Sequence, residues 1–299
     1  MFEKVYNAAS QKAGAGIRGR VFAKAFDHFV QWSKDEQDGG HHSMVARAEH
    51  SFFMSVVGKS IRSALGPNLK YLACGGAPLN VDLAHFFNGM DGITFIQGYG
   101  MTETAAPMIV NWQNANRVGS VGKPGPGMGV RTDDDGELQV MGPNVFLGYY
   151  KNPEKTAEVK MPDGWLRTGD LGAIDDDGFV YITGRKKDII VRGGENISSR
   201  EVEDIVLEYP GVREAAVVAM PDERLGERSC ACVSMRPGAP AMHLTDLVAF
   251  FDGRRVAKYK FPEYLVVLDA LPRTSSGKLQ KFALARMVRE RVAAGQPSD

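Results

Sequence analysis

Two stretches of the sequence decide its fold: Leu69–Pro78, which reads LKYLACGGAP, and Ile93–Thr104, which reads ITFIQGYGMTET. Each begins with a short apolar run and continues into glycines. This pattern is typical of a buried strand that ends in a tight turn. Two buried strands with a helix between them predict an α/β unit.

The region Val21–Leu65, before these strands, is predicted to be helical. One apolar stripe at helical spacing comprises Val21, Phe22, Ala25, Phe26, Phe29 and Val30. Farther along, the adjacent histidines His41 and His42 lie beside two glycines in a polar stretch. We expect a solvated loop there rather than a metal site, because no partner ligands lie nearby in the sequence.

Turn signals dominate after Thr104. Asp135-Gly136 precedes the apolar run 137–141, and Asp177-Gly178 precedes the run 179–183. Because Asp-Gly pairs favour tight turns that lead into strands, this region is predicted to be a small β subdomain.

A second α/β pattern begins near Arg185. Ser198 and Glu201 have the spacing of a capping box at the start of a helix, and Pro210-Gly211 would end that helix. Further elements are expected at 215–219 (strand), 244–251 (helix) and 264–268 (strand). The fold class is therefore α/β, with a second and smaller α+β domain.

Composition excludes several classes of protein. The 36 basic and 36 acidic residues of the 299-residue chain cancel, so no net field attracts nucleic acid. No apolar run approaches the roughly 20 residues needed to cross a bilayer, although peripheral contact with a membrane stays open. Glu3 and Lys4 lie where a secretory signal would be apolar. A cytoplasmic protein is expected.

The cysteines agree with a reducing compartment. Cys74, Cys230 and Cys232 are too few for a disulfide framework. Cys230 and Cys232 lack a second Cys or His pair at ligand spacing, and we expect them on a core strand.

Four segments place charged or hydroxyl side chains beside glycines at predicted strand ends, where α/β proteins bind ligands. Taken alone, the segments favour simpler structural explanations: a turn at Gly75-Gly76, a helix or turn cap at Asp170 and a solvated basic face at residues 185–187. The four segments are Gly75–Pro78, Gly98–Thr104 (GYGMTET), Gly164–Gly172 (GWLRTGDLG) with Gly184–Asn196 (GRKKDIIVRGGEN), and Leu271–Lys281 (LPRTSSGKLQK).

Together, in this order and spacing, the four segments resemble the adenylate-forming (AMP-binding) superfamily over Leu69–Lys281. The first residues, Phe2–Asn7 (FEKVYN), look like those of long-chain fatty-acid–CoA ligases. The segment Gly193–Glu203 (GGENISSREVE) resembles acyl-CoA synthetases more than amino-acid-activating domains.

The resemblance implies a reaction with three substrates: a fatty or other carboxylic acid, ATP and coenzyme A. The acid would be activated as an acyl-adenylate and then transferred to coenzyme A, with Mg²⁺ assisting. Attack of a carboxylate on the α-phosphate brings two anions together, so charge neutralisation and positioning would dominate catalysis.

The resemblance also implies roles for residues of the first domain. Thr102 would bind the α-phosphate and Glu103 would hold Mg²⁺, which prefers carboxylate oxygen. The nucleotide would be held by the turn Gly75, Gly76, Ala77 and Pro78 together with Tyr99, Gly100 and Met101.

Further roles fall later in the chain. Asp170 would accept both ribose hydroxyls with help from Arg185, and Lys278 would reach the acyl carboxylate and the α-phosphate. The small domain would rotate about a hinge at Lys187. The rotation would present the loop Arg192, Gly193, Gly194 and Glu195 to the pantetheine of coenzyme A.

The resemblance divides the chain into two parts. Residues 1–184 would be the C-terminal part of the large AMP-binding domain, with a parallel-sheet remnant and the small β subdomain. Residues 185–299 would be the small, mobile C-terminal domain.

Residues 1–68 lack the family's Ser/Thr/Gly-rich phosphate loop, so two other functions stay open. One is an inactive truncated fragment, a nucleotide- or acyl-binding module, or a piece that complements a separate N-terminal segment. The other is an acyl-AMP ligase that loads a carrier protein. Acyl chain length and oligomeric state are not decided by the sequence.

Overall fold

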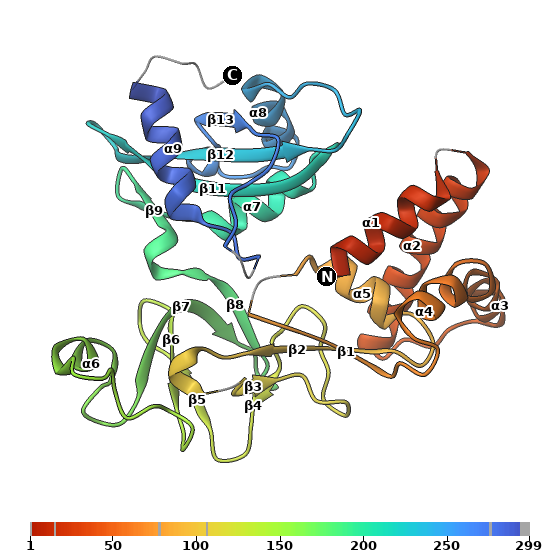
Figure 1. Cartoon of the computed structure of the whole chain (residues 1–299), viewed down its shortest axis with the longest axis horizontal. Helices are drawn as coiled ribbons and strands as arrows, with labels where there is room; N and C mark the ends of the chain where they lie inside the picture. Colours follow the sequence, from red (N-terminus) through yellow and green to blue (C-terminus); the bar gives the residue numbers. More distant parts are fainter. Residues whose placement is uncertain (1, 15, 77–78, 106, 275–276, 294–299) are drawn as a thin grey trace. The chain divides into compact units, whose positions relative to one another are not determined.

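The chain folds into two units whose segments alternate along the sequence (Figure 1). The computed structural model describes residues 2–14, 16–76, 79–105, 107–274 and 277–293. The first unit draws on residues 1–131, 139–167 and 174–181, and the second on residues 132–138, 168–173 and 182–299. Among the residues described, no helix is long and apolar enough to cross a membrane.

Helices open the first unit, as predicted. They are α1 (Phe2–Ala13), α2 (Ile17–Gln37), α3 (Met44–Phe53), the π-helical turn η1 (Met54–Gly58), α4 (Lys59–Leu65) and α5 (Val81–Asn88). The predicted stripe on α2 faces the core, where Phe22, Ala25 and Phe29 are buried. Phe29 meets Phe86 of α5 with ring centroids 5.9 Å apart, so α2 and α5 pack through aromatic contacts.

The predicted loop at His41 and His42 is present, but His42 is half-buried in it. Its ring stacks on Trp32 with centroids 3.5 Å apart, and Trp32 stacks on His50 at 3.9 Å. His41 is exposed. No group of metal-binding side chains is found among the residues described.

The predicted strand–helix–strand unit is present in the first unit. Strands β1 (Tyr71–Gly75) and β2 (Thr94–Tyr99) are parallel, with Gly75 opposite Gly98, and α5 lies between them in the sequence. The short antiparallel strands β3 (Ile109–Val110) and β4 (Lys123–Pro124) complete a sheet in the order β1-β2-β3-β4.

The predicted β subdomain is a four-stranded sheet in the order β5-β6-β7-β8. Its strands are β5 (Gly129–Thr132), β6 (Glu137–Met141), β7 (Leu166–Ile174) and β8 (Val180–Arg185), and helix α6 (Pro153–Val159) lies between β6 and β7 in the sequence. Asp133 Oδ1 accepts from the backbone N–H groups of Asp135 and Glu137 at 3.1 and 2.8 Å. Asp133, two residues before Asp135, therefore stabilises the predicted Asp-Gly turn.

The second unit is a five-stranded sheet with helices on both faces. Its elements are η3 (Lys186–Asp188), β9 (Ile189–Arg192), β10 (Glu195–Ser198), α7 (Ser199–Leu207), β11 (Val212–Asp222), β12 (Gly226–Met235), α8 (Leu244–Gly253), η4 (Lys258–Lys260), β13 (Tyr264–Val267) and α9 (Lys281–Ala293). The order is β10-β9-β12-β11, and β13 runs parallel to β12.

Burial on both faces explains the continuous apolar character of β11 and β12. Ala231 and Val233 pack in a cluster with residues of α7 and α8, among them Val206 and Leu247. Cys230 and Cys232 point to the opposite face, in a cluster that contains Leu284 and Val288 of α9. The prediction that these two cysteines lie on a core strand is confirmed.

Candidate functional site

The turn after β2 carries Thr102 and Glu103 on a single 3-10 turn, η2 (Thr102–Thr104). Thr104 is fully buried, and its hydroxyl accepts from Met101 N at 3.0 Å and donates to Met101 O at 2.9 Å. This local lock leaves Thr102 exposed and Glu103 half-buried. A hydroxyl and a carboxylate are thereby presented side by side at the end of a buried strand.

A second segment holds η2, and sequence reasoning missed it. Tyr149 donates its hydroxyl to Glu103 Oε1 at 2.7 Å. Phe146 N donates to Glu103 O at 2.7 Å, and Asn144 Nδ2 donates to Thr104 O at 2.7 Å. The hydrogen bond to the Glu103 carboxylate raises the pKa of Tyr149 above its ordinary value. Tyr149 thus orients the carboxylate, while Phe146 and Asn144 hold the backbone of the turn, and carboxylate oxygen suits Mg²⁺.

The glycine turn after β1 lies at the same sheet edge as η2, because β1 and β2 are parallel neighbours. A Cβ on Gly75 would lie 3.1 Å from Gly98 O, so the close approach of the two strand ends favours glycine. Gly76 has a φ of +76°. Tyr99 and Gly100 are half-buried beside this turn in the sheet, whereas Ala77 and Pro78 lie outside the described residues.

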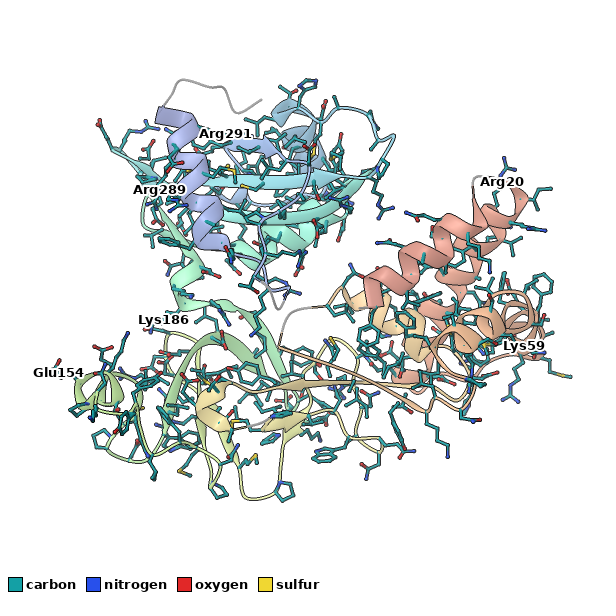
Figure 2. The ribbon with its side chains drawn as sticks, in the orientation of Figure 1. Arg20, Lys59, Glu154, Lys186, Arg289 and Arg291 are labelled. Carbon is teal, nitrogen blue, oxygen red and sulfur yellow. The ribbon has the colours of Figure 1, made fainter. Side chains whose placement is uncertain are left out.

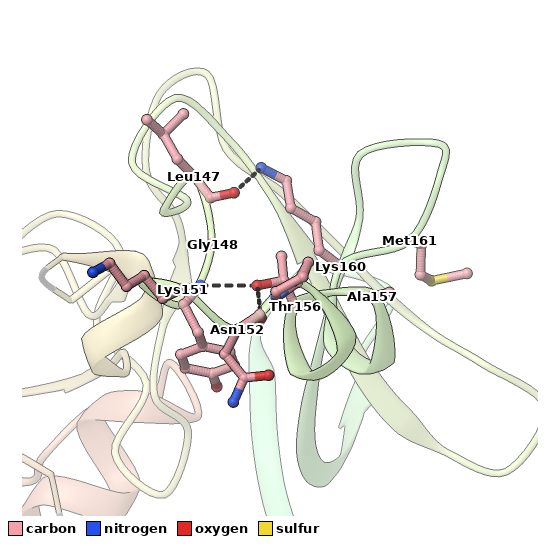
Figure 3. A pocket seen from close by; sticks show the side chains of 10 residues that line it. Leu147, Gly148, Lys151, Asn152, Thr156, Ala157, Lys160 and Met161 are labelled. Carbon is pink, nitrogen blue, oxygen red and sulfur yellow. Dashed lines mark hydrogen bonds between the residues drawn. The ribbon is translucent and has the colours of Figure 1, made fainter.

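A pocket of about 650 Å³ lies against the same 144–149 loop (Figure 3). Its lining includes Leu147, Tyr149, Asn152, Thr156 and Lys160. Lys160 Nζ donates to the carbonyl oxygens of Phe146 and Leu147 at 3.0 and 3.4 Å. Lys160 therefore connects this wall of the pocket to the loop that orients Glu103.

In the second unit, Asp170 on β7 is paired with Arg185 at the end of β8. Arg185 Nε donates to Asp170 Oδ1 at 3.0 Å. The Asp170 side chain is only 11% exposed, and that of Arg185 is 56% exposed. The preceding Gly169 has a φ of +72°, and its N–H donates to the buried Glu137 at 2.9 Å. A largely buried carboxylate is thus held in one orientation by an exposed guanidinium.

Lys186 and the predicted hinge residue Lys187 differ in their contacts. Lys186, which Figure 2 labels, contacts Asp135 Oδ2 and Glu137 Oε2, each at 3.2 Å. These hydrogen bonds, led by the one to Asp135, raise the pKa of Lys186. Lys187 follows on the same 3-10 turn and is exposed.

The segment from Arg192 to Glu195 is a two-residue hairpin between β9 and β10, with Arg192 opposite Glu195. Gly193 and Gly194 have φ values of +58° and +92°, as such hairpin loops require. Arg192 donates to both carboxylate oxygens of Glu263, at 3.0 and 2.9 Å, and this pairing raises its pKa. The exposed part of the hairpin is therefore Gly193, Gly194 and Glu195, while the charge of Arg192 is already matched.

Lys278 lies in a short loop before α9. Thr274 N donates to Lys278 O at 2.8 Å, and Lys278 N donates to Thr274 Oγ1 at 3.0 Å. These two hydrogen bonds join Thr274 to Lys278. Lys278 itself is exposed.

The structure distributes the predicted residues over the two units. Gly75, Gly76 and the segment 99–103 meet at one sheet edge in the first unit. The pair Asp170–Arg185, the hairpin 192–195 and the Lys278 loop belong to the second unit. Sequence reasoning missed the contacts of Tyr149, which lies outside the quoted segments, and of Lys186, which lies within Gly184–Asn196.

Two family models match this chain. The model described as AMP-binding enzyme matches residues 22–150, and the model described as AMP-binding enzyme C-terminal domain matches residues 201–278. The chain therefore belongs to the AMP-binding, adenylate-forming superfamily, as its motifs predicted.

Relatives within this superfamily are CoA ligases. A medium-chain fatty-acid–CoA ligase of Escherichia coli is 45% identical over 236 residues, which are 75% of this chain and 42% of that protein. The long-chain-fatty-acid–CoA ligase FadD15 of Mycobacterium bovis is 45% identical over 73% of this chain and 36% of its own length. A feruloyl-CoA synthase of Amycolatopsis sp. is 41% identical over 75% of this chain and 48% of its own length.

Solved structures agree with this assignment of family and fold. ATP-bound MatB from Rhodopseudomonas palustris matches with a TM-score of 0.70 and 34% identity, over 77% of this chain and 50% of that chain. The o-succinylbenzoate–CoA synthetase of Bacillus subtilis, in complex with ATP and magnesium, matches at 0.64 and 32%, over 76% and 50%. The chain spans half or less of the length of each of these five proteins.

Proposed function

We propose that this chain takes part in the ATP-dependent activation of a carboxylic acid to an acyl-adenylate and in its transfer to coenzyme A. The observation that carries the proposal is the 45% identity to a fatty-acid–CoA ligase over three quarters of the chain. A fatty acid is the proposed substrate, because that relative and FadD15 are named for fatty acids.

The proposed roles in the first unit come from the family resemblance, and the geometry at the end of β2 supports them. The exposed hydroxyl of Thr102 would bind the α-phosphate. Glu103, oriented by Tyr149, would bind Mg²⁺, which would neutralise charge on the phosphates. The turn Gly75–Pro78, together with Tyr99, Gly100 and Met101, would hold the adenine.

In the second unit, Asp170 would accept hydrogen bonds from the ribose hydroxyls, in the orientation fixed by Arg185. Lys278 would neutralise charge as the acyl carboxylate attacks the α-phosphate and pyrophosphate leaves. Lys187 would be the hinge. The hairpin Arg192–Glu195 would receive pantetheine, whose thiolate attacks the acyl carbonyl and releases AMP. The three cysteines are free, which agrees with a cytoplasmic enzyme.

The test is fatty-acid-dependent exchange of pyrophosphate into ATP by the purified chain, by Lys278→Ala and by the matched control Lys258→Ala at another exposed lysine. We expect exchange that Lys278→Ala lowers to a small but measurable residual rate and Lys258→Ala leaves unchanged. Octanoate, palmitate and ferulate as alternative acids would identify the acyl class.

Binding of AMP, followed by calorimetry, separates an enzyme from a binding module. AMP binding without exchange by any variant would contradict the enzymatic proposal and leave a nucleotide-binding module. Exchange with release of the acyl group to a carrier protein, and none to coenzyme A, would identify an acyl-AMP ligase instead.

A further inference from the structure

The loop that carries Lys278 is anchored at both of its ends. On one side Arg273 pairs with Glu214 of β11 and donates to Gly277 O at 2.8 Å. Arg273 and Leu279 form a backbone bridge, and Gln280 N donates to Pro272 O at 2.9 Å. These contacts tie Pro272 and Arg273 to Gly277, Leu279 and Gln280, and a second anchor follows at the start of α9.

The second anchor is Lys281, the first residue of α9. Its ammonium lies 2.6 Å from Glu203 Oε1, 2.9 Å from Ser199 Oγ and 3.7 Å from Asp188 Oδ2. Lys281 thereby joins three elements: the Lys278 loop, helix α7 and the 3-10 turn η3, which also contains Lys187.

Loss of the Lys281 anchor would leave Glu203 as a largely buried carboxylate without its cation. The Glu203 side chain is 11% exposed, and Oε1 also accepts from Val217 N of β11 at 2.7 Å. Burial raises the pKa of Glu203 above its ordinary value, while Lys281 opposes that shift. A buried carboxylate that loses its cation is strongly destabilised, so the pair resists opening of the loop.

We infer that Lys281 is a positioning residue for Lys278: through Glu203, Ser199 and Asp188 it fixes the loop that presents Lys278. The inference rests on the proposed function for the role of Lys278 itself. Lys278 is exposed, and only Leu279 and Gln280 separate it from the anchor. Its reach toward a substrate is therefore set by where Lys281 holds the backbone.

Tryptic cleavage tests the anchor without any catalytic readout. Trypsin cuts after Lys278 only when the loop opens, and mass spectrometry resolves that bond from others. We expect Lys281→Met to accelerate cleavage after Lys278 by about tenfold or more, and Lys281→Arg to restore resistance, because Arg retains the charge.

Cleavage after Arg255, an exposed site in the same unit, is the control for general unfolding. Unchanged cleavage after Lys278 in Lys281→Met would overturn the inference. Equal acceleration at both sites would also overturn it, since Lys281 would then stabilise the whole unit and not the loop.

A double-mutant cycle in the pyrophosphate-exchange assay tests the link to catalysis. If Lys281 acts through Lys278, Lys281→Met lowers exchange about tenfold or more in the wild-type background and has no further effect on residual exchange in Lys278→Ala. An equal loss in both backgrounds would contradict the inference.

Failure of the two proposals would look different. If Lys278→Ala leaves exchange unchanged, or if the chain shows no exchange, the proposed function fails, and cleavage after Lys278 alone decides whether Lys281 fixes the loop. If Lys278→Ala lowers exchange to its residual rate but Lys281→Met changes neither exchange nor cleavage, only the present inference fails.

Discussion

Asp170 combines two features at the scale of a single residue: a largely buried carboxylate and an exposed cation, Arg185, that holds it. We expect Asp170→Asn to weaken AMP binding by about tenfold to a hundredfold, the value of a lost charge-assisted hydrogen bond. Isothermal calorimetry with AMP measures this. Asp176→Asn, at an exposed aspartate on a neighbouring turn, is the control and should bind as the wild type does.

His85 predicts a dependence of stability on pH. It is 3% exposed on α5 and contacts Ser33 Oγ at 2.9 Å through Nδ1. Burial, assisted by Lys34, lowers its pKa from 6.5 to about 4. The unfolded chain therefore binds this proton more readily than the folded chain. The contribution to stability is complete above pH 6.5 and is lost as the pH falls toward 4, by up to about 1.4 kcal/mol per pH unit.

The measurement for His85 is the free energy of unfolding by urea between pH 7 and pH 4.5, in the wild type, in His85→Gln and in the exposed control His41→Gln. Loss of stability on acidification should be smaller in His85→Gln than in the other two proteins. The same acid dependence in all three would refute the assignment to His85.

Residues that depend on tertiary contacts were the ones that sequence reasoning missed. Cys230 and Cys232 were predicted correctly, because a run of apolar neighbours already indicates a buried strand. The stacking of His42 was not predicted, because it joins a loop residue to Trp32 of helix α2, ten positions earlier. The bond from Tyr149 to Glu103 joins positions 46 residues apart, so no local pattern announces it.

At the scale of elements, prediction succeeded where burial sets the pattern. The apolar stripe of α2 and the runs that became β1 and β2 were identified, with ends displaced by a few residues. Ligand binding by residues 192–195 stays a prediction, whereas the β9–β10 hairpin itself was not predicted, although two glycines between short apolar strands are a hairpin signal. The motif resemblance predicted ligand binding by these residues and made no prediction about the pairing of the strands on either side of them.

The hairpin yields a prediction for its backbone. Gly194 has a φ of +92° and no atom within 4 Å of a Cβ placed there, so alanine would meet strain but no clash. We expect Gly194→Ala to destabilise the second unit by about 1–2 kcal/mol. Gly253→Ala, at the end of α8 with equally open space, should instead be neutral or stabilising by up to about 1 kcal/mol.

Urea unfolding followed by circular dichroism compares these two glycine variants. Equal effects would show that the positive φ of Gly194 carries no cost in the folded chain.

At the scale of the whole molecule, each unit has its own hydrophobic core. The cluster around Phe29, Phe86 and Phe95 draws its members from the first unit, and the clusters around Phe251 and Leu284 draw theirs from the second. The sequence anticipated two cores through its two α/β patterns. It did not anticipate that short segments near 132–138 and 168–173 group with the second unit, because contacts between distant strands decide that grouping.

Separate cores predict separate unfolding. Phe251 and Phe86 are both fully buried, and truncation of either to alanine should cost about 3–5 kcal/mol in its own unit. All three tryptophans, Trp32, Trp112 and Trp165, belong to the first unit, so tryptophan fluorescence reports on that unit alone. Phe251→Ala should therefore lower the midpoint temperature of one calorimetric transition and leave that of the fluorescence transition unchanged. Phe86→Ala should lower the midpoint temperature of the fluorescence transition. A fluorescence shift of equal size in both variants would mean that the two cores unfold as one cooperative body.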